Sequence, residues 1–248
     1  MRRVTRRASL VAWAQLALAL APARALAYRP FDQTDADVAP PREIELELGP
    51  FAVLHDSAGG TALAPGFVFN YGLVRRLELV VEDHNRFPVG SSSGSQTSES
   101  EPSLLVKGIL REGAMQEQTG PSVALEVGAL LPTLPHPDGF GAASTLIVSL
   151  RWPAATVHAN LEVNYSRDHK LEALGGAIVE GPHTWRIRPV AEGYVEREGD
   201  GVTLFSALGG AIWGLREDLS VDAAARAARE AGSALFELRL GMTWAFAL

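Results

Sequence analysis

The chain has 248 residues and no cysteine, and its 22 lysines and arginines stand against 29 acidic residues, a formal net charge of −7. The lack of thiols excludes disulfides, thiolate metal sites and a lipidated N-terminal cysteine. The acidic balance argues against nucleic acid as a partner, because phosphate binding requires a basic face.

The first 27 residues have the parts of a secretory signal peptide. Arginines cluster over 2–7, an apolar run follows over 8–21, and alanines at 25 and 27 fit the small-residue rule for cleavage before Tyr28. The signal contains five arginines and no acid, so its removal changes the net charge from −7 to −12. A membrane anchor is the alternative, although the apolar run is short for a bilayer span. Export is therefore expected, and no later stretch is apolar for long enough to form a membrane helix.

Residues 28–41 (YRPFDQTDADVAPP) are polar and proline-rich, which predicts an extended leader. It is expected either to stay in the periplasm or, if the following strands close into a barrel, to lie inside the lumen as a plug. If the leader lies in the lumen, charges on the wall could pair with Arg29, Asp32, Asp35 and Asp37.

From residue 42 onward the chain divides into about twelve segments of strand length separated by turn signals. Most connections are short, so consecutive strands are expected to be antiparallel neighbours. The Ser/Gly-rich stretch 85–102 and the Pro/Gly-rich stretch 132–142 predict longer loops at one end, and 111–120 is a moderately long turn at the other. The predicted strands are 42–54, 62–74, 75–84, 103–111, 122–131, 143–152, 155–167, 172–180, 184–196, 203–215, 219–228 and 234–246.

Most of these segments alternate between apolar and charged or polar residues, although 172–180 and 203–215 are too rich in Gly and Ala for their faces to be assigned. In the last segment Phe236, Leu238 and Leu240 share one face, while Glu237 and Arg239 share the other. A secreted β-sandwich would bury the apolar face, whereas an outer-membrane barrel turns it to lipid and turns the charged face to the lumen. Segment lengths near ten residues, an even strand number and a mixture of opposite charges on the polar faces favour the barrel.

The predicted fold class is therefore all-β, an antiparallel up-and-down transmembrane β-barrel of about twelve strands over 42–248. The last strand would close the barrel and carry the signal for the barrel-assembly machinery, with outer-membrane lipid against its apolar face. The inner wall would carry the candidate selectivity residues Glu45, Glu47, Glu78, Lys107, Glu126, Arg151, Glu162, Arg186, Arg188, Glu192, Asp222, Arg226, Glu237 and Arg239.

Several stretches together carry a resemblance to a known family. "YRPFDQTDADVAPPREIELELG" at 28–49 is followed in order by "FNYGLVRRLELVVE", "ALLPTLPHPDGFG", "WRIRPVAEGYVER", "LSVDAAARAARE" and "FELRLGMTWAF". The mature chain thus resembles the bacterial outer-membrane proteins of the phenol-degradation meta-pathway family, a transporter-like group. The resemblance implies a barrel and passage of hydrophobic or aromatic molecules. Family members usually end on or near an aromatic residue, whereas here Leu248 is last and Phe246 precedes it by two.

The residues that could carry chemistry leave three functions to weigh. A passive channel for small hydrophobic or aromatic molecules would use the inner charges as a selectivity region, without a cofactor. In a closed structural envelope barrel the same charges would seal the lumen, and loops such as 85–102 would meet a partner. A hydrolase is the third: His158 lies near Asn160 on an inward face, but no serine motif accompanies it. Neither a phosphate loop nor an HExxH-type metal motif is present.

Overall fold

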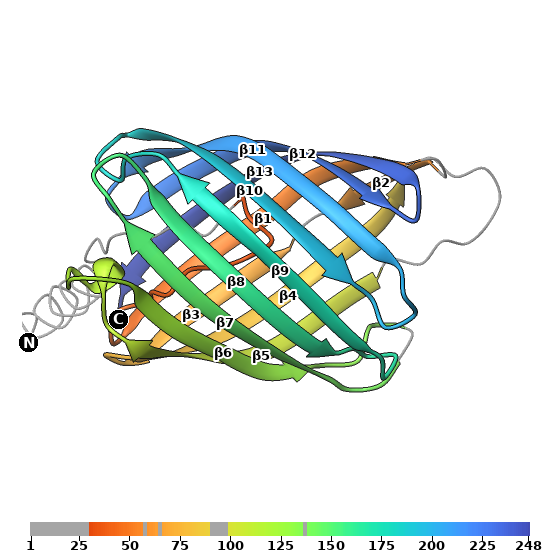
Figure 1. The fold of residues 1–248 in the computed structure, drawn as a ribbon, viewed down its shortest axis with the longest axis horizontal. Coiled ribbons are helices and arrows are strands. Elements are labelled where there is room, and N and C mark those ends of the chain that lie inside the picture. The colour runs from red at the N-terminus through yellow and green to blue at the C-terminus, as the bar shows by residue number, and fades with distance from the viewer. Residues whose placement is uncertain (1–29, 57–58, 64–65, 90–98, 136–137) are drawn as a thin grey trace, which may run out of the picture.

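Period-two alternation produces a barrel of antiparallel strands in the computed structural model, which describes residues 30–56, 59–63, 66–89, 99–135 and 138–248 (Figure 1). Residues 1–29, with the expected signal peptide, Tyr28 and Arg29, lie outside the described residues. The strands of the described part are β1 (Glu43–Asp56), β2 (Gly59–Leu63), β3 (Phe67–Val74), β4 (Leu77–Val89), β5 (Glu99–Arg111), β6 (Ser122–Leu130), β7 (Gly141–Arg151), β8 (Thr156–Tyr165), β9 (Leu171–Glu180), β10 (Ile187–Arg197), β11 (Thr203–Arg216), β12 (Leu219–Glu230) and β13 (Ser233–Ala247).

These strands occupy twelve positions in the barrel wall. β2 and β3 both pair with β1 and with β4, so together they fill a single position. Every other strand pairs antiparallel with its neighbours in sequence. The first and last strands close the ring, with Glu43 opposite Ala247 and His55 opposite Phe236. The prediction of a closed, all-β, antiparallel barrel of about twelve strands is confirmed.

The two faces of the wall differ in the way expected of a barrel surrounded by lipid. On β13, the outward Phe236, Leu238 and Leu240 are 51%, 56% and 59% exposed, while the inward Glu237 and Arg239 are 1% and 4% exposed. A water-soluble sheet would bury the apolar side chains and expose the charged ones. The arrangement here is the reverse, and it matches the outward apolar band and polar interior of membrane barrels.

Tryptophans mark one rim of the barrel. Within the described residues they are Trp152, Trp185, Trp213 and Trp244, all 36% exposed or more. All four lie at the end where β1 begins and β13 ends, because Trp152 follows β7, Trp185 precedes β10, and Trp213 and Trp244 are near the last residues of β11 and β13. Such a ring is typical of the aromatic girdle at a membrane interface.

Two of the sequence expectations for strand ends are wrong. The 85–102 loop is much shorter than expected, because β4 continues to Val89 and β5 begins at Glu99, with Arg86 paired to Glu99; residues 90–98 lie outside the described part. Conversely, 184–186 precede β10 rather than forming part of it. No helix in the described ranges is long and apolar enough to cross a membrane.

Candidate functional site

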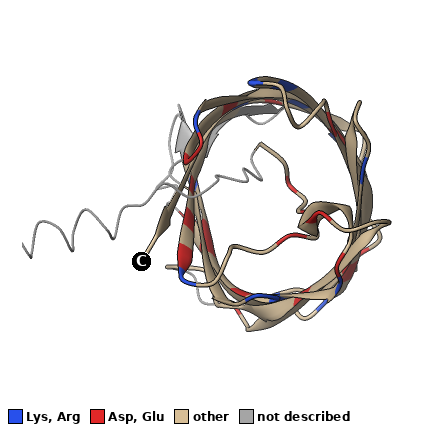
Figure 2. Ribbon diagram, turned by 90° about the vertical axis from the view of Figure 1, so that its left-hand side faces the viewer, with Lys and Arg blue, Asp and Glu red and all other residues tan. Residues whose placement is uncertain are grey.

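Residues 30–41, here called the lumen segment, run through the interior of the barrel, as the view along its axis shows (Figure 2). Their backbone is held mainly by side chains of the wall. The amides of Asp32 and Gln33 donate to the Glu192 carboxylate, at 3.1 and 2.9 Å. The Ala36 amide donates to Ser149 Oγ at 2.9 Å, and the Ala39 amide donates to the Glu78 carboxylate. The amides of Asp37 and Val38 donate instead to carboxylates within the segment. An extended segment without strand partners thus has its donors satisfied by side chains, most of them from the wall.

Small residues on the inner wall make room for this path. A Cβ on Gly72 of β3 would lie 2.0 Å from the Pro40 carbonyl oxygen, and a Cβ on Gly176 of β9 would lie 2.3 Å from Gln33 Nε2. Both distances are far shorter than any contact with a real Cβ, so only glycine fits. Within the stretch 172–180, whose faces could not be assigned, Gly176 therefore has a packing reason.

Two arginines form one charged centre with the beginning of the lumen segment. Arg239 donates to both Glu237 oxygens, at 2.8 and 3.1 Å, and its Nη1 lies 2.7 Å from Asp32 Oδ1. Arg226 Nη1 donates to Glu237 Oε2 at 3.1 Å, and its Nη2 donates to Tyr194 Oη at 2.7 Å. Buried charges need such partners, because an uncompensated one costs several kcal/mol, roughly 3–5.

A second charged centre surrounds Lys107, on the opposite part of the wall. Its Nζ lies 3.7 Å from Glu78 and 3.7 Å from Asp35 of the lumen segment, and it donates to Thr34 Oγ1 at 3.2 Å. Register places Lys107 directly between Glu78 on β4 and Glu126 on β6. Glu45 and Glu47 of β1 are also buried in the lumen, so this part of the wall is mainly acidic.

A serine, a histidine and a glutamate form a row that sequence reasoning missed. Ser149 Oγ lies 2.8 Å from His158 Nδ1, and His158 Nε2 lies 3.1 Å from Glu180 Oε1, with Arg188 3.6 Å from the other Glu180 oxygen. No serine motif in the sequence marks this pair, because Ser149 is the cross-strand partner of His158 and belongs to the preceding strand. Ser149 is fully buried and accepts the Ala36 amide, so in this structure the row holds the lumen segment.

The remaining predicted wall residues are more dispersed. Glu162 accepts from Thr145 and Asn164, Asp222 is buried on β12, and Arg151 Nη2 contacts Met115 Sδ at 3.4 Å. Arg186 is the exception. It is exposed at the rim, where it donates to the backbone carbonyls of Gly214 at 3.1 Å and Leu215 at 3.5 Å.

The 112–121 connection covers the lumen segment at the end of the barrel where β1 begins and β13 ends. Its short 3-10 helix η1 (Ala114–Gln116) places the Gln116 amide so that it donates to the Ala36 carbonyl and to an Asp37 carboxylate oxygen, both at 2.9 Å. Asp37 therefore binds an amide rather than the wall charge that was expected. The moderate length expected of this turn is explained by its contact with the segment.

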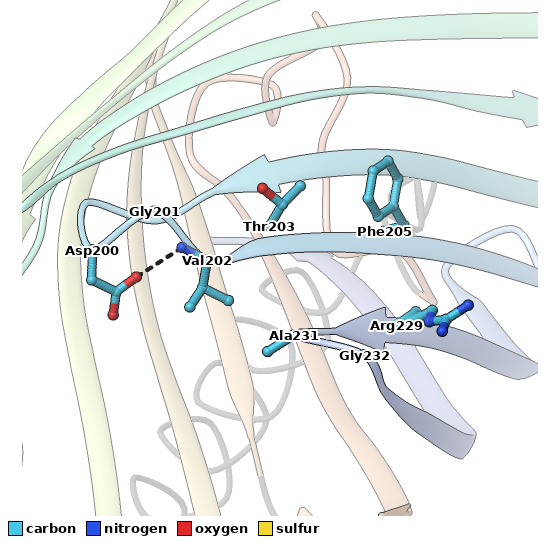
Figure 3. Close-up of a pocket in the computed structure, with 8 residues that line it drawn as sticks. All are labelled: Asp200, Gly201, Val202, Thr203, Phe205, Arg229, Ala231 and Gly232. Atoms are coloured by element: carbon cyan, nitrogen blue, oxygen red, sulfur yellow. Dashed lines mark hydrogen bonds between the residues drawn. The ribbon is translucent and has the colours of Figure 1, made fainter.

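A surface depression of about 510 Å³ lies far from these charges, at the opposite rim (Figure 3). It is lined by residues 200–202 of the β10–β11 loop, by Thr203 and Phe205 of β11, by Arg229 and by the β12–β13 turn. The hydrogen bond from the Val202 amide lowers the pKa of Asp200, so this carboxylate stays ionised. An aromatic ring and a cation at an exposed rim are typical of a membrane interface and indicate no chemistry.

No protein-family model matches the sequence, and no curated protein matches it. Several solved structures, in contrast, are similar to this chain. The COG4313 outer membrane channel from Pseudomonas putida F1 is similar with a TM-score of 0.60 and 11% identity, over 87% of this chain and all (100%) of that chain. The KdgM porin in complex with disordered oligogalacturonate has a TM-score of 0.54 and 5% identity, over 82% of this chain and 98% of that one. The fold is that of an outer-membrane channel barrel. At such identities the likeness concerns the fold alone. The relation to the phenol-degradation family therefore belongs to the proposed function.

This outer-membrane channel fold directs attention to the lumen as the candidate site. In the described residues no group of three or more His, Asp or Glu side chains could hold a metal ion. What the lumen offers instead is a charged wall with an extended segment bound to it. The arrangement can bind, admit or exclude solutes.

Proposed function

We propose that this protein is a passive outer-membrane channel for small hydrophobic or aromatic molecules, exported by residues 1–27, and that the lumen segment controls whether it is open. The observation that carries the proposal is the way this segment is held. Its contacts with the wall include hydrogen bonds and ion pairs from side chains, at Glu192, Ser149, Glu78 and Arg239. Apolar packing accompanies them, of Phe31 against Val190 and Ile212 and of Ala36 against Ala124 and Ile147. Hydrogen bonds of this kind are exchanged for water at a net cost of about 0.5–1.5 kcal/mol each between neutral groups and about 1.5–3 kcal/mol each where one group is charged.

The solute class rests on the resemblance of the mature chain to the phenol-degradation meta-pathway family. The selectivity region would consist of the inward charges on the wall, chiefly Arg188, Arg226, Arg239 and Lys107 with their carboxylate partners. No residue in the described lumen resembles an energy-coupling site, and passive diffusion requires none.

A closed structural envelope barrel is the second candidate, and one observation favours it. Ile147, Ile178, Ile212 and His158 on the inner wall are at most 1% exposed, so the lumen around them is filled in this state. If the lumen segment never leaves, these contacts serve stability alone.

Conductance in a planar bilayer separates the two candidates. The mature protein, and a variant lacking residues 28–41, would be refolded, and the shift between unboiled and boiled samples on a gel would establish that each barrel had formed. A channel controlled by the segment gives rare openings in the wild type and steady conductance in the deletion variant. Folded barrels that conduct in neither form would refute the channel, and equal conductance in both would refute control by the segment.

A further inference from the structure

We infer that Arg239, Arg226 and Tyr194 form a binding site for organic carboxylates, and that Asp32 occupies this site as an internal ligand. The inference deepens the proposed function by naming a solute class for the lumen. Binding to the site can be measured without transport, so the two proposals can fail separately.

The Asp32 carboxylate is held at both oxygens, as a bound ligand would be. Arg239 Nη1 lies 2.7 Å from Oδ1. Tyr194 Oη donates to Oδ2 at 3.0 Å, and Arg226 Nε lies 3.6 Å from the same oxygen. Two guanidinium groups and a phenol converging on one carboxylate are the donors that carboxylate recognition uses.

The wall supplies most of the contacts that hold these donors, and the lumen segment adds one hydrogen bond, from Arg239 Nη1 to the Pro30 carbonyl oxygen at 2.9 Å. Glu237 accepts from both arginines, and Arg226 also donates to Ser206 Oγ at 2.8 Å and to Tyr194 Oη at 2.7 Å. Two arginines against Glu237 leave one positive charge, which matches one carboxylate. The site is therefore preorganised for a monoanion when Asp32 leaves.

Glu192, the acidic residue next to this site, is paired with groups other than the Asp32 carboxylate. Glu192 accepts the backbone amides of Asp32 and Gln33, so it faces donors beside the carboxylate rather than the carboxylate itself. A solute with an N–H or O–H group near its carboxylate could use the same acceptor.

The site can be reached from the lumen, and Tyr194 connects it to an apolar cluster. The Asp32 side chain is 27% exposed. Tyr194 packs in one cluster with Leu204 and Ala228, against which Leu174 and Leu235 also pack. A carboxylate with an apolar body, such as an aromatic acid, fits this combination of charge and surface better than a polar polyanion or an amine.

Benzoate and its uncharged isostere benzamide are the probes. Isothermal titration of the folded, detergent-solubilised mature protein compares the wild type with Asp32→Asn. Because the internal ligand competes with the added one, removal of its charge should tighten benzoate binding by about tenfold or more. Benzamide binding should not change. In the Asp32→Asn background, Arg239→Gln should abolish the gain, whereas Arg216→Gln, at an exposed arginine outside the lumen, should retain it.

Gel mobility before and after boiling verifies that each variant is folded. Equal tightening for benzoate and benzamide would mean that loss of Asp32 only makes room, and it would overturn the carboxylate site. Unchanged benzoate affinity in folded Asp32→Asn would overturn it as well. Benzoate binding in a barrel that does not conduct would uphold the carboxylate site and refute the channel. Conductance without benzoate binding would uphold the channel and refute the carboxylate site.

Discussion

Replacing Glu192 by alanine should release the beginning of the lumen segment. The Glu192 carboxylate accepts two backbone hydrogen bonds, from the amides of Asp32 and Gln33. A hydrogen bond to a charged group contributes roughly 1.5 kcal/mol or more, so the bound state should lose about 3 kcal/mol. Each 1.4 kcal/mol corresponds to a factor of ten. The released population should therefore rise about 100-fold.

A single introduced thiol measures this population, since the chain contains no cysteine. Gln33→Cys is suitable because Gln33 is 6% exposed and neither of its side-chain amide atoms has a hydrogen-bond partner. When release and rebinding are fast compared with labelling, the maleimide reaction rate follows the released population. The matched control is Glu196→Ala, four residues along the same face of β10, which keeps both Glu192 bonds. Equal labelling rates with and without Glu192 would show that these bonds do not hold the segment.

Three further outcomes are expected. Gly72→Val should displace the lumen segment and raise channel conductance, because a Cβ there would lie 2.0 Å from a carbonyl oxygen of the segment, whereas Gly209→Val, with open space around its Cβ, should leave conductance unaltered. Leu238→Arg should lower the free energy of unfolding in phospholipid vesicles by about 2–4 kcal/mol if this outward face meets the middle of a bilayer; an unchanged urea midpoint would contradict a membrane position. Arg188→Ala should shift the reversal potential in a KCl gradient towards cations by exposing a carboxylate, while Arg186→Ala should not, since its guanidinium binds carbonyls at the rim; equal shifts would contradict this assignment.

The faces of the strands were predictable because alternation is a local property of extended backbone. Glu237 and Arg239 are two residues apart, so any strand places them on one face, and their burial opposite the exposed Phe236 and Leu238 agrees with the prediction. Arg186 was misplaced because the alternation extends back beyond Ile187, where pairing with β11 begins, and Val190, where pairing with β9 begins. Alternation does not reveal where a strand begins.

The partners across the lumen were not predictable from the pattern. Ser149 meets His158 only because the register of β7 and β8 places them opposite each other, and Glu180 joins them from the next strand. A shift of the register by one residue would turn half of such a row outward.

The sequence by itself determined a closed barrel with outward-facing apolar side chains and an inner wall of charges, because period, strand length and turn spacing are local properties of the chain. Only the tertiary structure decided which charges meet. Asp32 and Arg239 lie 2.7 Å apart although more than two hundred positions separate them in the chain. Their contact exists because β13 pairs with β1 and returns the end of the chain to its beginning. The route of the lumen segment past Gly72 and Gly176 likewise depends on space that appears only when the ring is closed.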